Sequence, residues 1–145
     1  SYKRFLPGSW APTHIVWSYA NRAAFIRIPE RQTARRLELR IGDPACNPYI
    51  YVAGILAAAL DGIENKLDPG AAISGDVGAH GGSTGAIRVP PNLERALEAL
   101  ECDGVIRDGI GALIVDEFIK VKRSEWDAFV SHVGAWDREW YFERY

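Results

Sequence analysis

The chain has 145 residues, 48% of them hydrophobic and 25% charged, which is enough for one packed core and excludes an intrinsically disordered chain. The net charge of -2 is unevenly spread, since residues 1–40 hold eight basic residues and two acids, while nine basic residues and seventeen acids follow. With no apolar stretch long enough to cross a bilayer, no recognisable secretory signal and no metal-like cysteine spacing, we expect a cytoplasmic protein without a membrane partner.

The first 46 residues are expected to form two or three antiparallel strands. Residues 14–29 are rich in β-branched and aromatic side chains, and residues 35–41 (RRLELRI) alternate between polar and apolar. Because side chains alternate across a strand, Arg36, Glu38 and Arg40 would share one polar face.

This charged face has two readings. Guanidinium groups bind phosphate and carboxylate bidentately, and a carboxylate is an oxygen ligand for Mg²⁺, so the face suits small anionic reactants with a metal ion. The alternative is an exposed strand with a short ladder of salt bridges, which would add little stability. Seven of the eight basic residues are arginines dispersed along strand-like sequence, which argues against a nucleic-acid partner.

Helices are expected after this region. Asn47 predicts an N-cap with Pro48 at the first helical position, and residues 47–67 are apolar on nearly every side, which predicts a buried helix packed on the sheet. Residues 68–91 are rich in glycine and predict a flexible loop; the HGGSTG segment within it resembles a phosphate cradle but lacks the lysine of a P-loop. Residues 92–145 predict helices with a break near Gly134.

Nucleophilic catalysis is not indicated. The three histidines, His14, His80 and His132, are far apart in sequence, and none belongs to a helical metal pair or a nucleophile motif. The remaining chemistry is electrostatic, namely neutralising phosphate and orienting carboxylate.

Several short motifs follow one another in a specific order. They are SYKR (1–4), NR (21–22), IRIP (26–29), ARRLELR (34–40), DPACNPY (43–49), LAAALDGIENKLDP (56–69) and PNLERALEALECD (91–103). Together they resemble the C-terminal part of the catalytic domain of the glutamine synthetase family. The expected fold is α+β, as a fragment of a larger catalytic domain: strands with the site (1–46), a buried helix (47–67), a Gly-rich loop (68–91) and helices (92–145).

The resemblance implies an ATP-dependent carboxylate-amine ligase that forms a γ-glutamyl amide through γ-glutamyl phosphate. Its substrates are glutamate, ATP and ammonia or an amine, its metal is Mg²⁺ or Mn²⁺, and family members form homo-oligomers. By position, Arg4 and Arg40 resemble the pair that binds the glutamate carboxylates. Arg22 resembles the catalytic arginine that meets both the transferring phosphoryl group and glutamate.

The resemblance assigns three further residues. Arg27 and Arg36 resemble contacts to the ATP phosphates, and Glu38 resembles a ligand of the divalent metal. The other metal ligands of the family lie upstream of the matched segment, so the 145-residue chain alone is expected to lack activity.

Two departures from the family pattern stand out. Ammonia-using members carry a glutamate where this chain has Trp10, and an indole cannot act as that base but can line an amine pocket. This favours an enzyme of the γ-glutamyl-polyamine or γ-glutamyl-amide branch. Thr33 replaces a nucleotide-contacting lysine of some relatives. The alternatives are an ammonia-using glutamine synthetase, and a non-catalytic relative that serves as an oligomerisation or interaction module.

Overall fold

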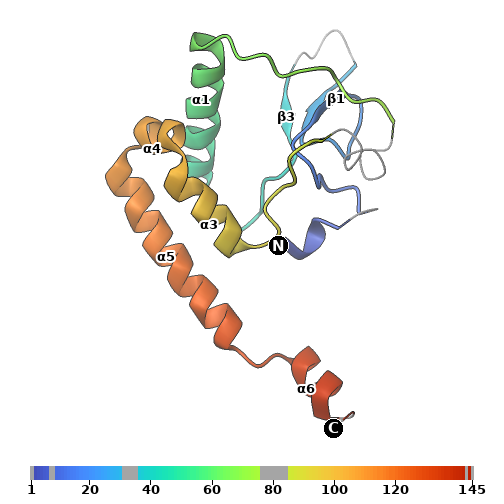
Figure 1. Ribbon diagram of the computed structural model, residues 1–145, viewed down its shortest axis with the longest axis vertical. Helices are drawn as coiled ribbons and strands as arrows, with labels where there is room; N and C mark the ends of the chain where they lie inside the picture. The colour runs from blue at the N-terminus through green and yellow to red at the C-terminus, as the bar shows by residue number, and fades with distance from the viewer. Residues whose placement is uncertain (1, 7–8, 31–35, 76–84, 143, 145) are drawn as a thin grey trace. The chain divides into compact units, whose positions relative to one another are not determined.

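The computed structural model describes residues 2–6, 9–30, 36–75, 85–142 and 144 (Figure 1). It divides into two compact units, Ser1–Asn92 and Leu93–Tyr145. The first unit holds the short strands and one long helix, and the second is helical. Each unit is described by itself.

The described residues of the first unit form a 3₁₀ turn, three short strands and one helix. These are η1 (Tyr2–Arg4), β1 (Trp17–Tyr19), β2 (Ile26–Ile28), β3 (Glu38–Leu39) and α1 (Pro48–Glu64). The strands form one sheet in the order β1-β2-β3. The α+β class expected from the sequence is therefore confirmed.

The sheet is mixed, so the expectation of a wholly antiparallel sheet is wrong. Strands β1 and β2 pair in parallel, whereas β2 and β3 pair antiparallel with Arg27 opposite Glu38. Only six residues separate β1 from β2, and a parallel pair usually needs a crossover of a dozen or more, so a short connection favours a hairpin on sequence grounds. Here the chain turns at Ala20, whose φ of 55° lies in the left-handed region, and the Ala20 N–H donates to the Ile28 carbonyl.

One extended segment bonds to the other edge of β1, and a second one pairs with the residues that precede β1. The Ile73 N–H donates to the Trp17 carbonyl at 3.0 Å, and His14 forms a bridge with Arg88. The buried residues Val16 and Ala24 form a small core beneath these segments, together with partly buried alanines and isoleucine. Strand β1 is thus held on both edges.

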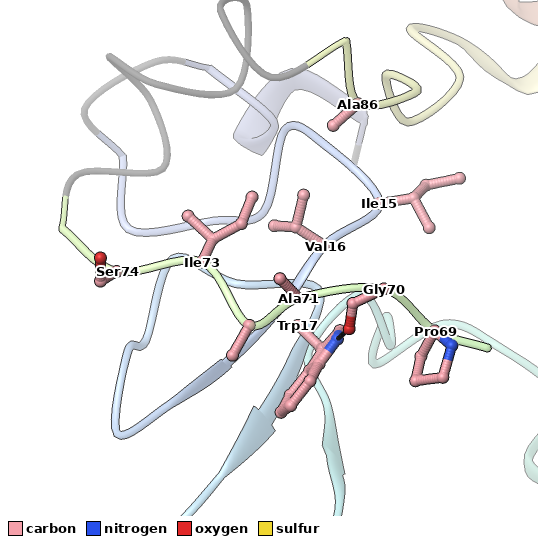
Figure 2. A pocket seen from close by; sticks show the side chains of 10 residues that line it. Ile15, Val16, Trp17, Pro69, Gly70, Ala71, Ile73, Ser74 and Ala86 are labelled. Carbon is pink, nitrogen blue, oxygen red and sulfur yellow. Dashed lines mark hydrogen bonds between the residues drawn. The ribbon is translucent and has the colours of Figure 1, made fainter.

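An open pocket lies between residues 15–17 and the segment 69–74, with Ala86 at its rim (Figure 2). Its lining is mostly apolar, and the Trp17 indole N–H donates to the Gly70 carbonyl at 3.0 Å across it. The described residues that line this pocket include no arginine and no acid. The charged face predicted from the sequence is elsewhere in the unit.

Helix α1 begins at the predicted cap. The Asn47 side chain accepts hydrogen bonds from the Tyr49 and Ile50 N–H groups, and Pro48 is the first helical residue. The expectation of a buried helix is wrong for this chain, because no residue of α1 is buried and Leu56, among others, is exposed. A helix with apolar side chains on every face is buried only when other elements pack against every face. The described elements of this unit leave most of the surface of α1 exposed.

The second unit contains four helices, α3 (Leu93–Cys102), α4 (Gly104–Ile110), α5 (Ala112–Ser131) and α6 (Ala135–Phe142), of which the first three pack together. Its core consists of Leu97 from α3 with Val115 and Ile119 from α5. The break between α5 and α6 falls next to Gly134, as predicted, and the Gly134 N–H donates to the Asp137 carboxylate. None of the described helices is long and apolar enough to span a membrane.

Candidate functional site

A cluster of charged side chains lies on β2 and β3. The antiparallel register places Arg27 opposite Glu38, and Arg27 Nη1 lies 2.7 Å from Glu38 Oε2. Arg36 approaches the other carboxylate oxygen, with Nη2 at 2.6 Å and Nε at 2.9 Å from Oε1. The side chains of Arg27 and Glu38 are 20% and 24% exposed, so the pair lies near the surface without being fully solvated.

The electrostatics of this cluster favour anions. Hydrogen bonds from Arg27 and then Arg36 lower the pKa of Glu38 below its ordinary value of 4.5, so the carboxylate is ionised at neutral pH. Among the described residues, two guanidinium groups contact this one carboxylate, and these three groups together carry a net positive charge. Arg27 Nε is buried and has no hydrogen-bond partner among the described residues, which leaves it donor capacity.

Arg40 continues the same face beyond the end of β3. Its N–H donates to the Phe25 carbonyl at 3.0 Å, so the antiparallel pairing extends one step and Arg40 lies on the side of the sheet that carries Glu38. Its Nε donates to the Arg22 carbonyl at 2.6 Å. Arg40 therefore ties the strand to the connection that carries the exposed side chain of Arg22.

Arg4 reaches this region from the N-terminal turn. Its Nη2 donates to the Gly42 carbonyl at 2.8 Å, and Gly42 lies two residues beyond Arg40 in the chain. The hydroxyl of Ser9 in turn donates to the Arg4 carbonyl at 2.7 Å. Arg4 is thus linked to the end of the charged face by a contact between segments that are 38 residues apart.

Trp10 is not brought into contact with these arginines by any hydrogen bond or ring contact among the described residues. Its side chain is 73% exposed and its φ is 57°, a left-handed conformation that is uncommon for a bulky residue. Thr33 and nearly all of the HGGSTG segment lie outside the described residues. The structure therefore brings the side chains of Arg27, Arg36 and Glu38 into contact. Arg40 and Arg4 are linked to neighbouring segments of the chain through the backbone carbonyls of Arg22 and Gly42, and Trp10 makes no such contact among the described residues.

The charged face alone does not fit a metal ion. Mg²⁺ needs six oxygen ligands in near-octahedral geometry, and both oxygens of Glu38 accept hydrogen bonds from arginines. No group of three or more His, Cys, Asp or Glu side chains suited to a metal occurs in the described part of the chain. Among the described residues, the charged face offers Glu38 alone as a metal ligand, and the salt-bridge reading of the face describes its present contacts correctly.

Sequence reasoning missed two residues at this site, Gly42 and Tyr51. The Gly42 carbonyl holds Arg4, and the Tyr51 side chain packs against Gly42. No residue type at these positions signals chemistry, because a backbone carbonyl and a packing contact leave no motif. Both residues become visible only from the contacts that Gly42 makes with Arg4 and with the first turn of α1.

Comparisons with known proteins identify the family. The family model "Glutamine synthetase, catalytic domain" matches residues 1–141. Glutamine synthetase of Thermus thermophilus is 43% identical over 150 residues, which is all of this chain and 34% of that protein. The enzyme of the same name from Methanocaldococcus jannaschii is 41% identical over 142 residues, covering 94% of this chain and 31% of that protein.

Solved structures agree. The chain of a "GmaS/ADP complex" is 42% identical with a TM-score of 0.83 and covers 92% of this chain and 30% of that one. Plasmodium falciparum glutamine synthetase, at 23% identity, supports the fold alone, with a TM-score of 0.78 over 97% of this chain and 36% of that one. The chain spans about a third of the length of these relatives. It belongs to the glutamine synthetase family and corresponds to the C-terminal part of the catalytic domain.

Proposed function

We propose that this chain supplies the anion-binding face of an ATP-dependent carboxylate-amine ligase that joins glutamate to an amine. In the first step a glutamate γ-carboxylate oxygen attacks the γ-phosphorus of ATP, and ADP leaves. In the second step the amine nitrogen attacks the acyl carbon of γ-glutamyl phosphate and loses a proton, and phosphate leaves. The observation that carries the proposal is the surplus of guanidinium charge on β2 and β3, with two arginines against one carboxylate at Glu38.

The proposed roles follow from charge and position. Arg27 and Arg36 bind phosphate oxygens of ATP, since a guanidinium fork matches phosphate bidentately. Arg22, whose side chain is exposed and whose backbone carbonyl accepts a hydrogen bond from Arg40, meets the migrating phosphoryl group. An arginine aimed at that group stabilises charge in the transition state and is worth several orders of magnitude in rate.

Arg4 and Arg40 bind the carboxylates of glutamate in this proposal. Both guanidiniums are already oriented by one hydrogen bond to a backbone carbonyl, Gly42 for Arg4 and Arg22 for Arg40. An arginine has five N–H donors, so each keeps donors for a carboxylate. Orientation before binding lowers the entropy cost of holding the substrate.

A divalent ion, Mg²⁺ or Mn²⁺, belongs to the proposal by family analogy only. Glu38 would be one of its ligands, after exchange of its arginine partners, and the remaining ligands would have to come from outside the described residues. The roles proposed above for the guanidinium groups do not depend on this metal ion.

Nucleotide binding is supported by the relative described as an ADP complex. An oligomeric parent enzyme is proposed on the same analogy.

The amine is proposed to be larger than ammonia. Trp10 presents a large, exposed aromatic surface where ammonia-using relatives have a glutamate base. The face of an indole ring attracts an organic ammonium ion through a cation–π interaction and through contact with its apolar part. Its left-handed backbone is the kind of strain that clusters at functional sites.

The second candidate is glutamine synthetase proper, which is favoured by the names of the curated relatives described above. A panel of ammonium, methylammonium, ethylammonium and a diamine, assayed with the full-length enzyme, separates the two. A preference for ammonium would reject the larger amine. If the enzyme uses a larger amine, the variant Trp10→Glu is expected to shift its substrate preference toward ammonium.

The ligase chemistry itself is tested with glutamate labelled with ¹⁸O in the γ-carboxylate. The proposed first step transfers one substrate oxygen to the phosphate that is later released. Amine-dependent appearance of one ¹⁸O in phosphate supports the proposal, whereas phosphate without label would reject it. The 145-residue chain alone is expected to show no such turnover.

A further inference from the structure

Neighbouring residues determine how the side chain of Arg4 is oriented. Arg4 lies on η1, a turn of three residues with no buried side chain. Such an element does not by itself fix a long side chain. The contact that orients the guanidinium is the 2.8 Å hydrogen bond from Nη2 to the Gly42 carbonyl. The position of Arg4 therefore depends on the position of that carbonyl.

The Gly42 backbone is in turn supported by Tyr51. A Cβ placed on Gly42 would lie 3.2 Å from Tyr51 Oη and 3.4 Å from Tyr51 Cζ, so the phenol ring is packed directly against this glycine. Gly42 does not have a positive φ, so its need for glycine is one of space and not of backbone conformation. A methyl group there would force the phenol or the backbone to move by a few tenths of an ångström.

Tyr51 is itself rigidly placed. It lies in the first turn of α1, and its N–H donates to the carbonyl of the capping residue Asn47 at 3.0 Å. The Asn47 side chain fixes the start of the helix through its bonds to the Tyr49 and Ile50 N–H groups. The capped first turn of α1 therefore positions the Tyr51 ring against the turn at Gly42.

The Tyr51 hydroxyl has an unusual environment. It is buried and has no hydrogen-bond partner among the described residues. Burial raises the pKa of Tyr51, Cys46 raises it further, and the nearby Arg4 opposes the shift, so the hydroxyl lies within electrostatic range of that guanidinium. A buried hydroxyl without a partner costs free energy, which calls for a reason for its retention.

The residue after Gly42 also acts on the N-terminal turn. Burial raises the pKa of Tyr2, and the carboxylate of Asp43 contributes to the shift. Asp43 is held in a turn by its own side chain, which accepts from the Ala45 N–H at 2.8 Å. Arg4 therefore contacts residue 42, while the charge of residue 43 acts on Tyr2.

We propose that Tyr51 is a positioning residue for the subsite that binds the amino-acid carboxylate, acting through the Gly42 carbonyl on Arg4. The ring supports the Gly42 turn, the turn presents its carbonyl, and the carbonyl orients the guanidinium. This inference rests on the proposed function, in which Arg4 binds a glutamate carboxylate. Tyr51 makes no contact with substrate in this account.

The expected kinetic signature is selective for one substrate. Tyr51→Ala in the full-length enzyme removes the ring and is expected to raise the KM for glutamate about tenfold, equivalent to about 1.4 kcal/mol of binding, while the KM for ATP stays within twofold. Tyr51→Phe keeps the ring and is expected to rescue the glutamate KM. The matched control is Tyr49→Ala, two residues earlier on α1 and 85% exposed, which is expected to change neither KM.

A double-mutant cycle tests the contact itself and does not require Tyr51→Ala to fold. Gly42→Ala is expected to raise the glutamate KM because its methyl group meets Tyr51 Oη at 3.2 Å. In the Tyr51→Phe background this closest atom is absent, so the same Gly42→Ala change is expected to have a smaller effect. Equal effects of Gly42→Ala in the two backgrounds would overturn the proposal.

The variant Arg4→Ala separates failure of this inference from failure of the proposed function. If Arg4→Ala leaves the glutamate KM unchanged, the proposed role of Arg4 is wrong. If Arg4→Ala raises it but the cycle is additive, the role of Arg4 stands and the role of Tyr51 is wrong. A rise in the KM values of glutamate and ATP together in Tyr51→Ala would indicate a general structural role and would also overturn the inference.

Discussion

The two units of this chain are built on different principles. The second unit packs amphipathic helices around Leu97, Val115 and Ile119, and its surface ion pairs lie within or between these helices, such as Arg95 with Glu98 and Arg123 with Glu101. The first unit has strands of two or three residues, little buried apolar surface, and long-range polar contacts that hold arginine side chains. Charged groups that are available to a ligand therefore gather where the regular structure is sparse, as is common for functional sites on loops and strand ends.

The largest effect is expected from Arg22 in the first unit. Arg22→Ala in the full-length enzyme should reduce kcat by at least about a thousandfold, because it removes the charge proposed to meet the migrating phosphoryl group. The matched control is Arg95→Ala in the second unit, an exposed arginine whose ion pair is local. A steady-state assay of amine-dependent phosphate release measures both. An Arg22→Ala enzyme with near-normal kcat would remove the functional distinction between the units.

A core substitution in the second unit should come next. Leu97 is only 3% exposed, and Leu97→Ala is expected to cost about 2–5 kcal/mol through the cavity that it leaves. The control, Leu113→Ala at a side chain that is 74% exposed, should change stability by no more than about 0.5 kcal/mol. Hydrogen exchange of α3 and α5 amides in the full-length protein reports the local stability. Similar exchange rates in the two variants would show that this core does not stabilise the unit.

The cap of α1 should contribute less. Asn47→Ala removes the acceptor of the Tyr49 and Ile50 N–H groups and is expected to cost about 1 kcal/mol. The exchange of these two amides should accelerate about fivefold, while Asn65→Ala at the other end of the helix leaves them unchanged. Unaltered exchange of Tyr49 and Ile50 would mean that packing outside the described residues fixes the helix start.

The smallest effect should be the response of the first unit to acid. Because two arginines lower the pKa of Glu38, its ionised form stabilises the folded state above the ordinary value of 4.5, and this contribution is lost as the pH falls through the lower folded-state value. Acid unfolding followed by tryptophan fluorescence should be less steep in Glu38→Gln than in the wild type below that pH. Superimposable profiles would show that the ion pairs do not stabilise the sheet.

Local signals in the sequence predicted local features well. The cap at Asn47 and the helix break at Gly134 depend on neighbouring residues only, and both occur as expected. The alternation around Glu38 predicted that Arg36 and Glu38 share one face, because the side-chain period of a strand is a property of its backbone, and the two side chains form an ion pair.

Features that depend on distant contacts could not be predicted. The parallel pairing of β1 with β2 contradicts the usual rule for a short connection, and it depends on the left-handed turn at Ala20. The exposure of α1 depends on what covers it, and periodicity does not report this. The hydrogen bond between Arg4 and Gly42 joins segments 38 residues apart and involves a carbonyl that every residue possesses.

The two readings of the charged face also illustrate this limit. Glu38 does form salt bridges with Arg27 and Arg36, as the salt-bridge reading expects, and the same contacts concentrate positive charge where phosphate is proposed to bind. Alternation places these groups on one face, but it does not reveal what completes the site.

The most direct test is a structure of the full-length enzyme with ADP and a glutamate analogue bound. We predict that phosphate oxygens lie within hydrogen-bond distance of Arg27 and Arg36, and that a carboxylate of the analogue contacts Arg4 or Arg40. Nucleotide bound away from β2 and β3, with Arg27 and Arg36 still paired to Glu38 alone, would contradict it.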